Sequence, residues 1–161
     1  MYLPCIILAR KNSKGLRYKN RIKFCNKPLI EHTINHAKKT KFITHVVISR
    51  DDKKIKQISE SLKCDVLYPR IKRLSNDKAK SEDAIKDALE WYEKKYKVKT
   101  KYYCYLQITE PLRPKKILEK CIQKIFKNKE LGSVFAAFET HKNYWQFNKN
   151  KKKYFLISSK K

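Results

Sequence analysis

Two kinds of apolar pattern alternate along the chain. Continuous apolar or β-branched runs occur at residues 3–9, 45–49, 65–68, 102–108 and 132–139. Between them, apolar residues recur every three or four positions at 27–40, 50–64, 81–96 and 114–128. A continuous run is typical of a strand buried on both faces of a parallel sheet, and the wider spacing is typical of an amphipathic helix. The alternation predicts an α/β fold, a three-layer sandwich in which helices connect the strands of a mainly parallel sheet.

The starts of two predicted helices carry local signals. Pro28 opens the helical pattern of residues 27–40, and proline is tolerated in the first turn of a helix. Asp51 and Asp52 stand at the start of the pattern over residues 50–64, where a negative side chain interacts favourably with the helix dipole. These residues support a helix at both places.

Size and composition indicate one folded domain with a large positive charge. The chain has 161 residues, of which 41% are hydrophobic and periodically distributed, so disorder of its main part is disfavoured. Its 41 lysines and arginines against 15 acidic residues give a net charge of +26. Such a charge attracts nucleic acid, an anionic membrane or a phosphorylated small molecule. The lysines are scattered over every segment, however, so the excess is explained first as a lysine-rich solvated surface, and charge alone selects no function.

Cysteine and histidine positions argue against disulfides and against a metal site built from these residues. The five cysteines include no Cys-x-x-Cys pair, and the four histidines lack metal-type spacing. Cys5, Cys104 and Cys121 lie in apolar patterns and are interpreted as small buried hydrophobes. We expect a reducing, cytoplasmic compartment. The N-terminal apolar run is too short for a secretory signal, and no stretch approaches the ~20 apolar residues that span a bilayer.

Segments of interest for function follow four of the predicted strands. They are residues 10–20, 68–81, 106–113 and 138–145. In an open parallel α/β sheet, ligands bind outside the carboxyl ends of the strands. We therefore expect these loops to meet at one edge of the sheet and to form a pocket there.

The first of these loops has the character of an anion site. It contains a Ser-Lys-Gly turn at residues 13–15, whose backbone N–H groups can face an anion. Arg10 and Lys19 flank the turn as charge-assisted donors. The loop is neither a Walker A sequence nor Gly-x-Gly-x-x-Gly. On these grounds alone, a phosphate site and a solvated basic loop both remain open.

The order of residues in this loop resembles a known family. Ala-Arg, two further residues, Ser-Lys-Gly and then Lys-Asn is similar to the N-terminal signature of the acylneuraminate cytidylyltransferases (CMP-sialic acid synthetases). The matching positions are Ala9, Arg10, Ser13, Lys14, Gly15, Lys19 and Asn20. The segment 26–34 resembles the family's Lys-Pro-Leu-Ile helix start, and 46–52 resembles its second strand, with Arg50 in place of a threonine.

The resemblance continues over about 140 residues. Residues 74–81 are similar to a family loop through Leu74, Asp77, Ala79 and Ser81, while Lys80 departs from it. Residues 106–113 resemble the family's Leu-Gln-Pro-Thr-Ser-Pro-Leu-Arg, with departures at Ile108 and Glu110. Residues 132–137, Gly-Ser-Val-Phe-Ala-Ala, resemble a further family strand.

The resemblance implies a nucleotide-diphospho-sugar transferase (Rossmann-like) fold and a CTP-dependent reaction. In that reaction the anomeric hydroxyl of an acidic nine-carbon sugar attacks the α-phosphate of CTP, giving a CMP-sugar and pyrophosphate. It implies catalytic roles for Lys19 and Arg10 and a substrate-binding role for Gln107. The implied nucleotide-binding residues are Arg10, Asn12, Ser13, Lys14, Gly15, Lys19, Asn20, Arg70 and Ser81. The implied domain spans residues 1–140, and the basic stretch 141–161 is interpreted as a truncated continuation of it.

Part of the family's pattern is absent. The resemblance implies Mg²⁺ held by an Asp-x-Asp pair, but nothing after Glu139 in this chain is acidic. The family is usually homodimeric, and its dimerisation segment also lies beyond the matched part. The chain is thus similar to the N-terminal two-thirds of a cytidylyltransferase. Two alternatives remain: a module that binds CTP or another anion without turnover, and, disfavoured because it lacks any recognisable motif, a nucleic-acid-binding protein.

Overall fold

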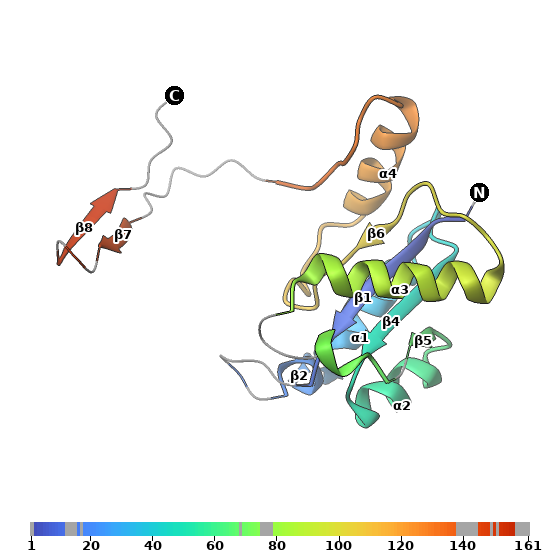
Figure 1. Ribbon diagram of the computed structural model, residues 1–161, viewed down its shortest axis with the longest axis horizontal. Helices are drawn as coiled ribbons and strands as arrows, with labels where there is room; N and C mark the ends of the chain where they lie inside the picture. The colour runs from blue at the N-terminus through green and yellow to red at the C-terminus, as the bar shows by residue number, and fades with distance from the viewer. Residues whose placement is uncertain are drawn as a thin grey trace.

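A parallel β-sheet forms the centre of the molecule (Figure 1). The computed structural model describes residues 2–11, 16, 18–67, 69–74, 79–137, 145–148, 150 and 152–156. The sheet has the order β5-β4-β1-β6, and each pair of neighbours is parallel. The strand bounds are β1 Pro4–Ala9, β4 His45–Arg50, β5 Asp65–Leu67 and β6 Cys104–Tyr105.

Helices cover both faces of this sheet, which confirms the predicted three-layer α/β fold. Their bounds are α1 Leu29–Lys38, α2 Lys53–Ser61, α3 Ser81–Tyr96 and α4 Ile117–Lys127. Buried residues of α1, α2 and α4 join one apolar cluster, and those of α3 join another on the opposite face. In Figure 1, α3 crosses in front of the sheet and α1 lies behind it.

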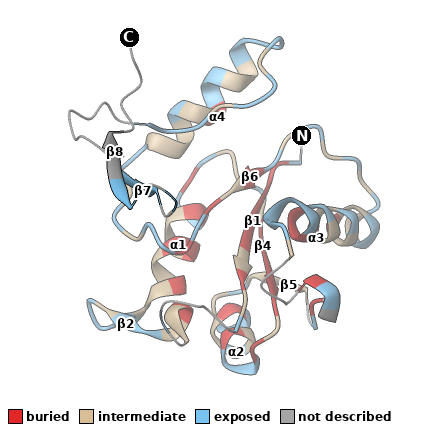
Figure 2. Ribbon diagram, turned by 60° about the vertical axis from the view of Figure 1, so that its left-hand side comes forward, coloured by how far each residue is buried: buried red, intermediate tan, exposed pale blue. Residues whose placement is uncertain are grey.

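Strand β1 shows why its sequence is apolar without interruption. Cys5 and Ile7 pack with Ile34 in the cluster of α1, while Ile6 packs with Tyr92 in the cluster of α3. All five side chains are fully buried, and the central strands are coloured as buried in Figure 2. Successive side chains of a strand point to opposite faces of the sheet, so a strand between two helical layers needs apolar residues at every position.

The helix starts agree with the local signals, with one shift. Asp52 caps α2, because its carboxylate accepts a hydrogen bond from the backbone N–H of Lys54 at 2.9 Å. Asp51 instead accepts from the backbone N–H of Lys11 at 2.6 Å. Pro28 precedes the first turn of α1 rather than lying in it, and belongs to the short strand β3 (Lys27–Pro28), which pairs with β2 (Lys23–Phe24).

The prediction of a strand over 132–139 is wrong for the part that the structure describes. Residues 132–137 form no strand, and the side chain of Phe135 is 81% exposed. Apolar β-formers make a strand only when a neighbour supplies hydrogen bonds and a packing face, and these residues pair with none of the described strands. The run at 102–108 also gives a shorter strand than expected, β6, although Leu106 N–H still donates to the carbonyl of Ile6 at 3.1 Å.

The C-terminal part contains an antiparallel hairpin. Strands β7 (Trp145–Asn148) and β8 (Lys153–Leu156) pair with each other in a separate two-stranded sheet. The domain boundary at residue 140 stays a prediction. In the described residues, no helix has the length and apolar character needed to cross a membrane.

Candidate active site

A cavity of about 380 Å³ opens at the carboxyl edge of the sheet. It lies beside the ends of β1 and β6, the 3₁₀ helix η1 (Lys19–Arg21), the segment after β5 and the start of α3. This is the edge at which open α/β sheets bind their ligands. The lining residues are Leu8, Arg10, Lys19, Asn20, Arg70, Leu74, Ala79, Lys80, Ser81, Ala84, Tyr105, Gln107, Ile108 and Thr109.

The cavity brings together six of the residues singled out in the sequence. They come from five separate parts of the chain and are Arg10, Lys19, Asn20, Arg70, Ser81 and Gln107. Asn12, Ser13, Lys14 and Gly15, the remaining members of the predicted site, lie outside the described residues. The convergence agrees with the predicted pocket, while the role of each residue stays a prediction.

A side-chain hydrogen bond fixes η1 against the end of β1. The amide Nδ2 of Asn20 donates to the backbone carbonyl of Arg10 at 3.0 Å, and Asn20 is buried. On the next residue, Arg21 Nε lies 3.3 Å from Asp52 Oδ2, the carboxylate that caps α2. These two attachments hold the backbone of Lys19 at the cavity wall.

Arg70 is a buried cation fixed by the end of β4. Its Nε donates to Ser49 Oγ at 2.9 Å, its Nη2 donates to the Ser49 carbonyl, and its backbone N–H donates to the carbonyl of Arg50 at 2.9 Å. Burial lowers the pKa of Arg70, and Arg10 lowers it further, while Asp51 acts in the opposite direction. An arginine remains charged in a protein, so an anion between the two guanidinium groups would be favoured.

The start of α3 supplies a second favourable environment for an anion. Lys80 is the N-cap residue and makes no side-chain capping bond, so the first N–H groups of this 16-residue helix are not satisfied by its side chain. Lys80 and Ser81 line the cavity. The positive end of the helix dipole therefore faces it, although Glu82 and Asp83 in the first turn offset part of this field.

Tyr105 closes the inner side of the cavity. Burial raises the pKa of its hydroxyl, whereas a hydrogen bond with Ser81 and the charge of Arg70 lower it. The ring also packs against the apolar cluster beneath α3. Tyr105 thus connects the core of the protein to two residues of the predicted nucleotide site.

The sequence reasoning missed the apolar wall of the cavity, formed by Leu8, Leu74, Ala84 and Tyr105. A signal was present in the period of the strands. Leu8 precedes Arg10 by two positions and Tyr105 precedes Gln107 by two, so each apolar residue shares a face with the polar residue nearer the strand end. The cavity consequently has an apolar inner row and a polar outer row.

The charges on the cavity wall are all positive in the described part of the chain. The cations are Arg10, Lys19, Arg70 and Lys80, and none of the described lining residues is a carboxylate. Mg²⁺ binds one or two carboxylates in addition to phosphate oxygens. Throughout the described ranges, no group of three His, Cys, Asp or Glu side chains is arranged to hold a metal. These residues therefore do not fit the magnesium site expected for the family.

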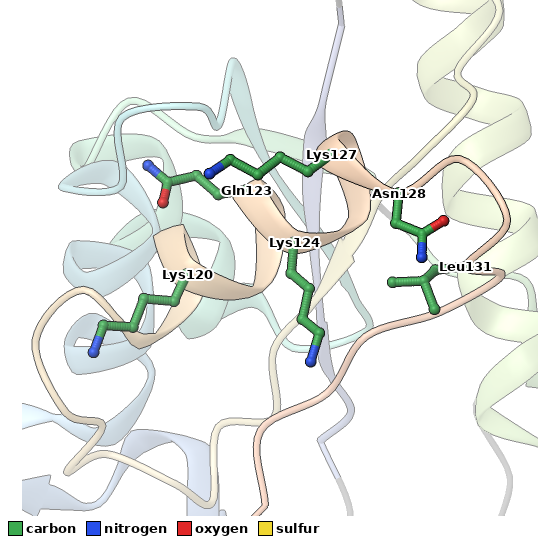
Figure 3. A pocket seen from close by; sticks show the side chains of 6 residues that line it. All are labelled: Lys120, Gln123, Lys124, Lys127, Asn128 and Leu131. Carbon is green, nitrogen blue, oxygen red and sulfur yellow. The ribbon is translucent and has the colours of Figure 1, made fainter.

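A second hollow of about 420 Å³ lies along α4 (Figure 3). Lys120, Gln123, Lys124, Lys127, Asn128 and Leu131 line it. All except Leu131 are exposed, and the three ammonium groups do not converge on one point (Figure 3). The hollow is remote from the carboxyl edge and has the character of a solvated lysine face.

Comparison with known sequences shows which proteins this chain is related to. The sequence profile of the family described as cytidylyltransferase matches residues 4–159. A pseudaminic acid cytidylyltransferase of Campylobacter jejuni is 34% identical over 135 residues, covering 84% of this chain and 57% of the relative. An N-acylneuraminate cytidylyltransferase of Escherichia coli is 38% identical over 110 residues, covering 67% of this chain and 24% of the relative. The chain thus spans little more than half the length of the first of these relatives, and less of the second.

Solved structures agree on the fold. A CMP:2-keto-3-deoxy-manno-octonic acid synthetase complexed with CTP superposes with a TM-score of 0.65 at 23% identity, over 81% of this chain and 50% of that one. A cytidylyltransferase from Leptospira borgpetersenii superposes with a TM-score of 0.61 at 22% identity, over 81% of this chain and 51% of that one. With the profile matching nearly the whole sequence, the chain belongs to the cytidylyltransferase family.

Proposed function

We propose that this chain binds CTP in the cavity at the carboxyl edge and takes part in transferring CMP to the anomeric hydroxyl of a sialic-acid-like nonulosonic acid, with release of pyrophosphate. The observation that carries the proposal is that one cavity of about 380 Å³ is lined both by cations, among them Arg10 and Lys19, and by apolar side chains, among them Leu8 and Tyr105. A nucleotide is likewise divided between its phosphates and its base.

The triphosphate belongs at the cationic row. Arg10 and Lys19 lie on this wall with the start of α3, and all of them favour negative charge. A triphosphate carries its charge over several oxygens, and separate cations at fixed positions can contact several of them together. The Ser-Lys-Gly sequence at residues 13–15, which is expected beside the phosphates, follows Arg10 closely in the chain.

The cytosine and ribose belong at the inner row. Leu8, Leu74 and Ala84 offer apolar contact to the flat base. Ser81, which is hydrogen-bonded to Tyr105, and Arg70 offer polar groups that a base edge or a ribose hydroxyl can contact. Gln107, which follows the end of β6, is then left for the acceptor sugar.

The chemistry follows from positions and charge. The anomeric hydroxyl of the sugar gives up its proton to solvent as its oxygen forms a bond to the α-phosphorus, the bond from that phosphorus to the oxygen bridging to the β-phosphate breaks, and pyrophosphate leaves with the electron pair. Such a transfer requires alignment of the reactants and stabilisation of the charge on the transferred group. Lys19 and Arg10 supply that stabilisation from the rim. No step is assigned to Mg²⁺.

A second candidate function is CTP binding without turnover by this chain alone. It is favoured by one specific observation: the described cavity wall supplies cations and apolar contacts but no carboxylate for a metal. The two candidates share the nucleotide site and differ only in product formation.

The proposal is tested in two steps on the full chain. Thermal unfolding is measured with CTP, UTP and ATP, and CTP is expected to stabilise by about 2.7 kcal/mol at about 100 times its Kd, with a smaller effect of UTP and none of ATP. Pyrophosphate is then measured after adding Mg²⁺ with N-acetylneuraminic acid or pseudaminic acid. Product formation supports the transferase, and stabilisation without product supports the binding module. Equal stabilisation by all three nucleotides would contradict both candidates. A stabilisation that depends only on the salt concentration would indicate a general polyanion site.

A further inference from the structure

Arg113 is a largely buried arginine that lies near the cavity without lining it. Its guanidinium is not among the groups that line the cavity, yet its side chain is only 8% exposed. Burial lowers its pKa, and Glu110 and Cys5 act in the opposite direction. Placing a guanidinium in such surroundings is unfavourable unless its N–H groups find partners, so these partners indicate what Arg113 does.

The first partner lies in the cavity wall. Arg113 Nη2 donates to the backbone carbonyl of Gln107, six residues earlier in the chain. Gln107, Ile108 and Thr109 form the wall that follows β6. The side chain of Arg113 therefore returns to the start of this segment and closes residues 107–113 into a loop (hereafter the 107–113 loop).

The second partner lies on a helix. Arg113 Nη1 donates to Thr33 Oγ1 at 3.4 Å, and Thr33 is fully buried on α1. Helix α1 packs on the face of the sheet opposite α3, so this contact ties the cavity wall to the other helical layer. A third group, Glu110 Oε2, lies 3.8 Å from Nη2 but is 67% exposed and adds little.

The shape of the side chain matters for this arrangement. A guanidinium is planar and carries separate nitrogens, so Arg113 reaches Gln107 with one and Thr33 with another. A lysine ammonium is a single point of charge at the end of a flexible stem. It could contact the carbonyl or the hydroxyl, and would not hold both at a fixed spacing.

We propose that Arg113 is a positioning residue that holds Gln107 at the rim of the cavity, and that its effect falls on the acceptor sugar rather than on CTP. The inference rests on the proposed function, because Gln107 faces the sugar only if CTP occupies the cationic and inner rows. The Arg113 guanidinium contacts neither substrate, since it stands behind the wall that it supports.

The first test needs no ligand. Backbone ¹⁵N relaxation reports the order of residues 107–110, and wild type is expected to give an order parameter of about 0.85, as in rigid backbone. In Arg113→Met it should fall below about 0.6, with a smaller fall in Arg113→Lys. Lys115→Met removes a neighbouring exposed cation and should leave the values unchanged. Unchanged order in Arg113→Met would overturn the proposal.

The second test separates the two substrates. CTP affinity, and N-acetylneuraminic acid affinity in the presence of CTP, are measured by calorimetry. Arg113→Met should weaken sugar binding about tenfold, because Gln107 is no longer held in position, and should change CTP binding by less than about twofold. The double variant Gln107→Ala/Arg113→Met should bind the sugar no more weakly than Gln107→Ala. A parallel loss of CTP affinity, or a full additional loss in the double variant, would show a merely structural role and refute the proposal.

Two further outcomes are distinguishable. If wild type does not bind CTP, the proposed function fails, and the relaxation measurement still decides whether Arg113 holds the 107–113 loop. If Arg113→Met does not fold, Thr33→Val removes the second partner while keeping the charge, and it should raise the mobility of residues 107–110 in the same direction. A Thr33→Val protein with an unchanged loop would also count against the proposal.

Discussion

The side-chain amide of Asn20 donates to the backbone carbonyl of Arg10 at 3.0 Å and so joins two residues that are ten positions apart in the chain. The two residues flank the loop expected to carry the phosphates, and Lys19 stands directly beside the attachment. Asn20 therefore has a structural role in addition to the predicted role in nucleotide binding. Its hydrogen bond to Arg10 closes the base of the loop.

We expect Asn20→Ala to open this base. The partly buried carbonyl of Arg10 loses the hydrogen bond from Asn20, so the free energy of unfolding should fall by about 1–2 kcal/mol. Lys19 should lose its fixed position, and CTP affinity should fall by about tenfold. Urea unfolding and calorimetry measure the two effects. Asn35→Ala is the matched control, because its amide contacts Glu31 only at 3.4 Å on α1. An Asn20→Ala protein that keeps its CTP affinity would contradict the role of this contact.

Lys19 and Lys120 offer a comparison of two lysines at two hollows. We expect Lys19→Ala to keep part of the CTP affinity, because Arg10 and Arg70 remain, but to lower product formation by about a hundredfold or more. Lys120→Ala, on the exposed face of α4, should change neither quantity. Binding is measured by calorimetry and turnover by pyrophosphate release. Equal effects of both substitutions would mean that only the overall charge matters.

Tyr105 is expected to limit the size of the base. Tyr105→Ala removes the ring that closes the inner side of the cavity, so ATP should begin to stabilise the variant against heat while it does not stabilise wild type. The lost packing of this half-buried ring should cost at most about 3 kcal/mol of folding free energy. Tyr105→Phe keeps the ring and loses only the bond with Ser81, so it should still reject ATP and bind CTP more weakly. Acceptance of ATP by the phenylalanine variant would assign the selection to the hydroxyl instead.

The environment of the Tyr96 hydroxyl leads us to expect a loss of stability at high pH. Burial, and then the bond that its hydroxyl donates to Asp65 at 2.7 Å, raise its pKa to about 12. A group that is harder to deprotonate in the folded state stabilises the fold below its unfolded pKa of about 10, and loses this contribution as pH rises towards 12. In urea unfolding, the free energy of unfolding of wild type should thus exceed that of Tyr96→Phe at pH 8, and the difference should vanish by about pH 12. A difference that grows above pH 10 would have the wrong sign.

The architecture was predictable from sequence wherever burial alone determines it. Helix α3 has the predicted bounds, Ser81–Tyr96, because its apolar stripe and its acidic first turn are local signals. The prediction of a strand over 132–139 was wrong in the described residues. An apolar run indicates that its side chains favour burial, but it does not indicate which strand will pair with it.

The site was predictable where residue order resembled the family, and not where contacts are long-range. Arg10, Lys19 and Gln107 were singled out and do line one cavity. The inner wall could have been inferred by counting two positions back along β1 and β6. The contact between Arg113 and Thr33 joins residues 80 positions apart, so no local sequence pattern predicts it.

The order of the cavity residues along the chain has a consequence for how acceptors can change. Every cation described on the cavity wall lies within the first 80 residues, whereas the 107–113 loop is a separate segment fastened by Arg113. If the proposed function holds, substitutions confined to that loop should alter sugar binding while the contacts to CTP are kept. The cavity would then consist of a constant part and an exchangeable part, and grafting the 107–113 loop of a relative with another acceptor would test this division.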